Sequence, residues 1–282
     1  MKNIIAATDL SARSDRAVHR AAMEAHARRA RLTLVSAVDD DLPAVAMKAL
    51  AEVAKDSLKA QATELAAKYS GLTIKTRVVY GRHFEAILNA AGDAKADLIV
   101  LGQHRQGGML DLFRGSTGER VARLGKQSVL VVADKPAKPY ARIVLGVDFS
   151  PSSAAAAAFV CEQFKGAKVD MVYAFDMPLA GIVAGVNKGK RRTARDEAAI
   201  QALVESDRKV FLRSLPKAAR GLPFHAEVGL PQDVVRAWVK KTKADLLVLG
   251  THGRSGLMRA VLGSVAEGFL RQPPCDVLVV KN

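Results

Sequence analysis

Aromatic residues, cysteines and long apolar runs are all scarce in this chain of 282 residues. Only 5% of the residues are aromatic, so the apolar 49% is mostly alanine, valine and leucine, a mixture that suits parallel strands under alanine-rich helices. No apolar run approaches the roughly 20 residues of a membrane helix, and the apolar segment before Asp9 is too short for a signal sequence. Cys161 and Cys275 form no CxxC pair and no metal-ligand spacing. We therefore expect no membrane contact and a reduced, cytoplasmic setting.

Acidic residues are also scarce: the chain has 28 of them and 43 lysines and arginines, which gives a net charge of +15. The excess is spread evenly, +7 up to Pro139 and +8 after it, with no basic tail. The one dense cluster, Lys188–Arg192, falls in a predicted loop. This pattern is typical of a solvated basic surface that favours anionic partners in general, and nucleic acid is not an expected partner.

The chain contains an internal repeat. Ile4–Ser11 matches Ile143–Ser150 at an offset of 139 residues, and Asp97–Gly102 matches Asp245–Gly250 at an offset of 148. The second copy therefore carries a net insertion between these two matched segments. We place the insertion at Met177–Arg192 and expect it to be a flexible loop. We predict two domains, 1–138 and 139–282, joined by a short proline- and lysine-rich linker.

Each copy alternates strands with helices, which predicts the α/β class and two tandem doubly wound parallel sheets of five strands, in the order 3-2-1-4-5, with helices on both faces. The predicted strands lie near residues 3–9, 32–38, 72–79, 97–102 and 128–133, and near 142–148, 168–175, 223–228, 245–250 and 276–281. The predicted helices lie near 12–29, 44–69, 82–93 and 115–125, and near 151–164, 193–214, 231–242 and 263–271.

A glycine-rich segment follows the fourth strand of the second copy. Its spacing is Gly250-x2-Gly253-x9-Gly263-Ser264, and a predicted helix opens at its end. Glycines allow close approach of the backbone, and a helix N-terminus offers unpaired N–H groups, so this segment predicts a phosphate site. In the order 3-2-1-4-5, strands 1 and 4 meet at the switch point where ligands bind, which brings Asp148 beside Gly250.

Common nucleotide and hydrolase motifs are missing: no Walker P-loop, no GxGxxG after a first strand, no GxSxG elbow and no HExxH. The long spaced glycine motif instead resembles that of the universal stress protein family, ATP-binding type, in its tandem form. The resemblance implies the adenine nucleotide alpha hydrolase-like fold and ATP, with or without Mg2+, as ligand. It places the adenosine beside Asp148 and the backbone of Ala174. The remaining implied site residues are Gly250, His252, Gly253, Arg254, Gly263, Ser264 and Val265.

The first copy departs from this pattern. The resemblance points there, more weakly, to Asp9, Ala37, Gly102, Gly115 and Ser116. Arg105, however, replaces the second glycine, and a residue with a Cβ is strained wherever glycine adopts a positive φ. We expect this site to be impaired.

Three functions remain open from the sequence. The leading one is a stress-response or regulatory protein that binds ATP at its second domain. The others are a slow ATPase or self-phosphorylating protein acting through Ser264 and His252, and a nucleotide-free structural adaptor. We expect no enzymatic activity beyond weak ATP hydrolysis, because no carboxylate is placed to orient His252. Expected partners are the adenine nucleotide and unidentified proteins. In the family the final strands pair across a two-fold axis, which implies an internal pseudo-dimer of the two domains and leaves a further homodimer open.

Overall fold

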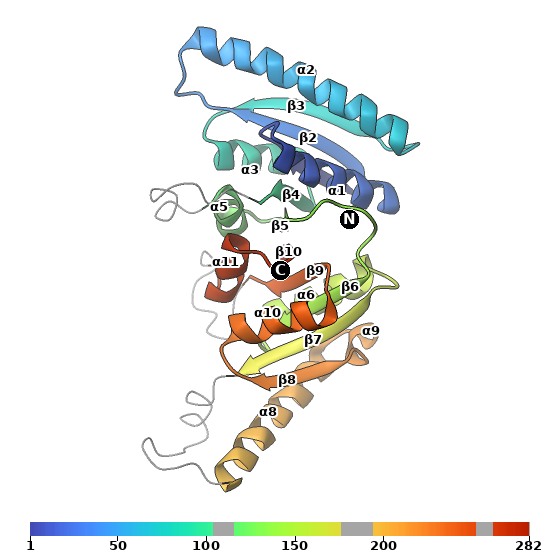
Figure 1. Ribbon diagram of the computed structural model, residues 1–282, viewed down its shortest axis with the longest axis vertical. Helices are drawn as coiled ribbons and strands as arrows, with labels where there is room; N and C mark the ends of the chain where they lie inside the picture. The colour runs from blue at the N-terminus through green and yellow to red at the C-terminus, as the bar shows by residue number, and fades with distance from the viewer. Residues whose placement is uncertain (104–115, 176–193, 252–261, 282) are drawn as a thin grey trace. The chain divides into compact units, whose positions relative to one another are not determined.

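The computed structural model describes residues 1–103, 116–175, 194–251 and 262–281 (Figure 1). They form two compact units. Unit 1 contains Met1–Pro139 together with Glu267–Val279. Unit 2 contains Tyr140–Ala266 and the last three residues.

Unit 1 is built on a mainly parallel sheet with the strand order β3-β2-β1-β4-β5-β10. Buried aliphatic side chains such as Ile4, Ile5 and Ile99, none more than 1% exposed, fill both faces of its central strands. The last strand, β10, runs antiparallel to β5, with Leu278 opposite Leu130. The six strands are β1 (Asn3–Ala7), β2 (Arg31–Val38), β3 (Ile74–Tyr80), β4 (Leu98–Gly102), β5 (Ser128–Val132) and β10 (Asp276–Val280).

The helices of unit 1 connect its parallel strands and pack against the sheet. Ser11 caps the first of them, α1, through its side chain, and Ser116 caps α5 in the same way. Right-handed crossovers place α1 and α2 on one face of the sheet and α3 with α5 on the other. The bounds are α1 (Ala12–Arg28), α2 (Ala44–Lys68), α3 (His83–Asp93) and α5 (Thr117–Leu124).

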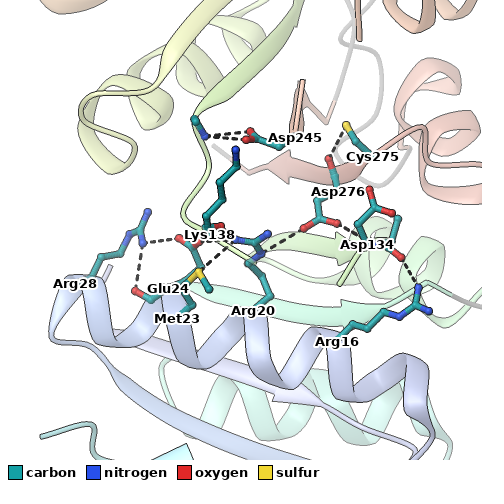
Figure 2. A network of polar contacts seen from close by, with 12 residues as sticks. Arg16, Arg20, Met23, Glu24, Arg28, Asp134, Lys138, Asp245, Cys275 and Asp276 are labelled. Atoms are coloured by element: carbon teal, nitrogen blue, oxygen red, sulfur yellow. Dashed lines mark hydrogen bonds and ion pairs between the residues drawn. The ribbon is translucent and has the colours of Figure 1, made fainter. Parts of the chain in front are cut away.

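A buried polar network holds β10 to the rest of unit 1 (Figure 2). Asp276, 1% exposed, accepts hydrogen bonds from the backbone N–H groups of Ala133 (2.9 Å) and Asp134 (3.2 Å). Its second oxygen lies 3.4 Å from Nε of Arg20 on α1, and Arg20 also donates to the carbonyl of Lys138. The C-terminal strand, the end of the first copy and α1 are thereby joined through one carboxylate.

Unit 2 repeats the first four positions of that order, with the strands arranged β9-β6-β7-β8, all parallel. Its strands are β6 (Arg142–Val147), β7 (Lys168–Phe175), β8 (Phe224–Val228) and β9 (Leu246–Gly250). Its helices are α6 (Pro151–Gln163), α8 (Ala194–Ser214), α9 (Lys217–Arg220), α10 (Pro231–Thr242) and the start of α11 (Ser264–Arg271).

The predicted α/β class, the parallel order and the alternation of elements are confirmed. The short helix α9, which begins after Pro216, was not predicted. The insertion Met177–Arg192, with its basic cluster, lies outside the described residues. No helix in the described ranges is long and apolar enough to cross a membrane. The cytoplasmic setting and the boundary at 138/139 stay predictions.

Candidate functional site

A cavity of about 250 Å³ opens in unit 2 at the carboxyl ends of β6, β7 and β9. This edge is where a doubly wound sheet binds its ligands. The cavity is lined by six residues that the sequence predicts, which come from four different segments of the chain: Asp148, Ala174, Gly250, Gly263, Ser264 and Val265. The sheet therefore brings these predicted residues together.

Asp148 is held in place by a tight turn between β6 and α6. Its Oδ1 accepts a hydrogen bond from the N–H of Ser150 at 3.0 Å, and the Ser150 side chain in turn caps α6 by accepting from the N–H of Ser153 at 3.1 Å. Asp148 thus supports the turn and also lines the cavity. Its part in the turn is therefore compatible with a ligand contact, which is the role that the sequence predicts for it.

The turn forces Phe149 into a left-handed backbone conformation, with φ of 62°. Such a conformation is strained for a bulky residue and persists only where surrounding contacts hold it. Here the ring of Phe149 stacks on Tyr173 at 4.2 Å between centroids and also meets Phe211 and Phe224. The first copy repeats the feature, since Leu10 after Asp9 also has φ of 62°.

Gly250 is required by packing against the start of α6. A Cβ at this position would lie 2.7 Å from the backbone carbonyl carbon of Ser152 and 2.8 Å from its side chain. The glycine therefore allows the start of α6 to pack closely against the end of β9. Sequence reasoning identified the residue but assigned its need for glycine to approach of a ligand.

The start of α11 forms the far wall of the cavity. Gly263 donates its N–H to the carbonyl of Thr251 at 2.8 Å, which brings the two ends of the glycine-rich segment together. Ser264 then begins the helix, and its side chain is exposed. The unpaired N–H groups of a first helical turn suit an anion, as the sequence predicts for Ser264 and Val265.

Three predicted residues of this site, His252, Gly253 and Arg254, lie outside the described residues. Sequence reasoning also missed the apolar part of the lining, which includes Val172 on β7 and Pro231 and Val235 on α10. Pro231 opens a helix at the carboxyl edge, and Val235 follows one turn later. The order 3-2-1-4-5 places that helix start beside the cavity, so the position of Pro231 in the sequence could have predicted its contact with the cavity.

Unit 1 has a corresponding cavity of about 350 Å³, lined by Asp9, Ala37 and Gly102 among the predicted residues. The start of α5 also lines it through Thr117 and Gly118. Ser116 caps that helix in a capping box: its N–H donates to Oε2 of Glu119 at 2.7 Å, and its Oγ accepts from the N–H of Glu119 at 3.1 Å. Arg105 and Gly115 lie outside the described residues.

The carboxylate of Asp9 is stabilised by the turn that it closes. Burial raises the pKa of Asp9, but hydrogen bonds from Ser11 and Ser14 outweigh burial and hold the pKa below its usual 3.8. Its Oδ1 accepts from the N–H of Ser11 at 3.0 Å. Asp9 is therefore ionised at neutral pH and places a negative charge at the edge of the unit 1 cavity.

Known proteins are similar to one copy of this chain or to both. The model of the universal stress protein family matches residues 1–133 and again 139–281. A universal stress protein of Mycolicibacterium smegmatis is 26% identical, with 99% of this chain and 96% of that protein covered. One from Methanocaldococcus jannaschii is 34% identical over 51% of this chain and 83% of its own length.

The solved structures agree on the fold. The crystal structure of a universal stress protein from Archaeoglobus fulgidus is 18% identical, covers 99% of this chain and 98% of its own, and superposes with a TM-score of 0.68. At this identity the likeness concerns the fold alone. With two family matches that together span nearly the whole sequence, the chain belongs to the universal stress protein family and carries its domain twice in tandem.

Proposed function

We propose that this chain is a stress-response regulatory protein that binds ATP in the cavity of unit 2. The observation that carries the proposal is the convergence of Asp148, Gly250 and the start of α11 on one cavity, as the spaced glycine motif predicts. The adenosine would lie beside Asp148, and the phosphates would accept hydrogen bonds from the first turn of α11.

The end of β7 offers a suitable acceptor for the adenine edge. Met171 donates its N–H to Pro223, and Phe175 accepts from Gly229, so both residues point their backbone groups toward β8. Alternate residues of a strand point theirs to opposite sides, so the carbonyl of Ala174 points to the β6 side. The last pair between β6 and β7 is Val147 with Tyr173. The carbonyl of Ala174 therefore lies past the end of the β6–β7 pairing, where an adenine amino group could donate a hydrogen bond to it.

A divalent ion would enter with the nucleotide. Within the described part of the cavity lining, Asp148 is the sole carboxylate, which is too few for a protein cage around Mg2+. Mg2+ commonly keeps several waters and binds through substrate phosphates, so its place would be on the triphosphate.

Ser264 offers the sharpest test, because its side chain is exposed and can change without disturbing the core. Ser264→Glu puts a negative charge beside the predicted phosphates, whereas Ser264→Gln has nearly the same size and no charge. A carboxylate near a helix N-terminus also favours folding, so the glutamate variant should stay folded. Titration calorimetry with a non-hydrolysable ATP analogue should show binding that Ser264→Glu weakens at least about tenfold relative to Ser264→Gln.

Gly263→Val is the second variant, since a branched side chain at this lining position would occupy the phosphate region. Circular dichroism and urea unfolding would confirm that it folds. The proposal is overturned if the wild-type protein shows no binding at millimolar ATP, or if a folded Gly263→Val variant binds as tightly as wild type.

A further inference from the structure

The helix α2 of unit 1 carries apolar side chains on both of its sides. Its inner side packs on β2 and β3, and the buried residues there include Ala51, Ala54 and Leu58. Its outer side faces solvent, yet four of the nine large apolar side chains that are exposed in the described part of the chain lie at its start. These four are Leu42 (38% exposed), Val45 (84%), Leu50 (49%) and Val53 (60%). A surface helix normally keeps its outer side polar, and apolar side chains gathered on one surface mark an interaction site.

The apolar residues of the outer side form a continuous stripe, which consists of Leu42, Val45, Ala49 and Val53. The last three are spaced four residues apart, so they lie one above the other along the helix. Leu42 extends the stripe to the point where the chain enters α2. Ala49 is exposed and small, so a second helix can approach closely at the middle of the stripe. No other labelled element of unit 1 lies on this side of α2 (Figure 1).

The charged residues beside the stripe are not evenly distributed along the chain. An acidic segment, Asp39–Asp41, precedes α2, whereas three exposed lysines, Lys48, Lys55 and Lys59, follow within the helix. A turn of 100° per residue places the three lysines on one flank of the stripe. Glu52 lies on the same flank, where its carboxylate is 3.3 Å from the ammonium group of Lys55.

An antiparallel pair of α2 helices, related by a two-fold axis at Ala49, brings unlike charges together. Val45 of one copy then lies level with Val53 of the second copy, because each residue is four positions from the axis. Lys48 lies two positions from the level of Glu52 of the second copy, a step of about 3 Å along the helix. A two-fold axis forms this ion pair twice.

The ends of such a pair are complementary as well. Lys59 lies ten positions from the axis and therefore passes the start of α2 in the second copy, which the acidic segment precedes. A parallel pair would instead set lysine against lysine at every level, which is unfavourable. The charges of α2 therefore favour a second copy of this chain, in antiparallel orientation, as the occupant of the stripe.

We propose that two copies of this chain associate through α2 as an antiparallel pair with Ala49 at the two-fold axis. The contact uses no residue that lines either cavity, and it does not depend on ATP binding. One helix face from each copy buries less than the roughly 1,200 Å² of a standard interface, so the dimer should dissociate in the micromolar range.

Analytical ultracentrifugation of the full chain, between about 1 and 500 µM, measures this association. Val45→Glu/Val53→Glu sets like charges opposite each other and should weaken the dimer at least about tenfold. Both valines are more than half exposed, so this variant should fold. The matched control is Val210→Glu, which changes a valine on α8 that is 66% exposed and should leave the association unchanged.

The charge pairing has a test of its own. Lys48→Glu should weaken the dimer, and adding Glu52→Lys to the same chain should restore it, because the exchanged charges meet again between the two copies. Circular dichroism would confirm that both variants keep their helix content. A dimer that Lys48→Glu leaves unchanged would contradict the antiparallel arrangement.

Cross-linking tests the position of the axis. In a Cys161→Ser background, Ala49→Cys should form a disulfide-linked dimer under mild oxidation, because the two Ala49 residues meet at the axis. Ala60→Cys lies on the same side of the helix, eleven positions from the axis, and should not cross-link.

The proposal fails if the wild-type chain stays monomeric at about 500 µM, or if Val45→Glu/Val53→Glu associates as wild type does. It also fails if Ala60→Cys cross-links as readily as Ala49→Cys. A monomer that binds phosphatidylcholine vesicles through Val45 and Val53 would assign the stripe to a membrane surface and would overturn the proposal.

Discussion

At the scale of single residues, the two glycines that end β4 and β9 differ in how closely they are packed. A Cβ on Gly250 would come within 2.7 Å of Ser152, whereas a Cβ on Gly102 would stay 3.1 Å from the nearest backbone atoms, which belong to Arg13 and Ser14. We predict that Gly250→Ala lowers the free energy of unfolding by about 1–3 kcal/mol, as overpacking does, and that Gly102→Ala costs less. Urea unfolding measures both.

Gly221→Ala is the control for this comparison, because no atom lies within 4 Å of a Cβ built at Gly221 and its φ of −91° suits any residue. Its free energy of unfolding should match wild type within about 0.5 kcal/mol. Equal losses in Gly250→Ala and Gly221→Ala would contradict the close approach of α6 to β9.

The lowered pKa of Asp9 predicts that the stability of the fold depends on pH. Its pKa is lower in the folded protein than its usual 3.8, because hydrogen bonds from Ser11 and Ser14 outweigh burial. The ionised carboxylate therefore stabilises the fold above pH 3.8, and this stabilisation is lost as the pH falls through the lower folded pKa. Asp9→Asn removes the titration while keeping the shape of the side chain.

The measurement is urea unfolding of wild type and Asp9→Asn between pH 3 and 6. The stability difference between them should be constant near pH 6 and should shrink below about pH 3.8. A difference that grows as the pH falls would show that the pKa of Asp9 is raised instead.

Asp148, Gly250 and Ser264 could be predicted from the sequence because each stands where a strand ends or a helix begins, next to a recognisable glycine. Arg13, His83 and Thr8, which line the cavity of unit 1, could not. Whether a side chain in the first turn of a helix lines a cavity depends on the angle at which the chain enters that helix. The chain enters α1 through the left-handed conformation of Leu10, which no sequence pattern predicts.

At the scale of elements, β10 depends on one buried carboxylate for its attachment to α1. Asp276→Ala would remove the acceptor for two backbone N–H groups and leave Arg20, 5% exposed, without its partner on β10. Breaking a buried ion pair from one side leaves an uncompensated charge, so we predict a loss of about 3–5 kcal/mol in the free energy of unfolding.

The control is Arg123→Ala, which breaks an ion pair with Glu267 in the same unit. The Arg123 side chain is 44% exposed, so Arg123→Ala should lower the free energy of unfolding by less than about 1 kcal/mol. Chemical denaturation of both variants would test the difference, and similar small losses would mean that Asp276 does not anchor the strand.

Element positions were largely predictable, because strands here are short aliphatic runs and helices begin at capping residues such as Ser11 and Ser150. The helix α9 was missed because four residues show no periodicity. The antiparallel pairing of β10 with β5 inside unit 1 could not be derived from periodicity either, since after its first residue each strand is a continuous aliphatic run without alternation.

At the scale of the whole molecule, the duplication provides two cavities on one chain whose linings have diverged. Unit 2 keeps the spaced glycine motif and an apolar lining around Asp148. Unit 1 has Arg13, His83 and Thr8 in the lining of its cavity and a capping box at the start of α5. The prediction of ATP binding therefore concerns unit 2 alone.

The most direct test of ATP binding in unit 2 is calorimetric titration of wild type, Ser264→Glu and Ser264→Gln with a non-hydrolysable ATP analogue under identical conditions. We predict binding by wild type and by Ser264→Gln, and binding at least about tenfold weaker in Ser264→Glu, because the added charge faces the phosphates. Equal affinity of the two variants, or no binding by wild type at millimolar nucleotide, would contradict this assignment.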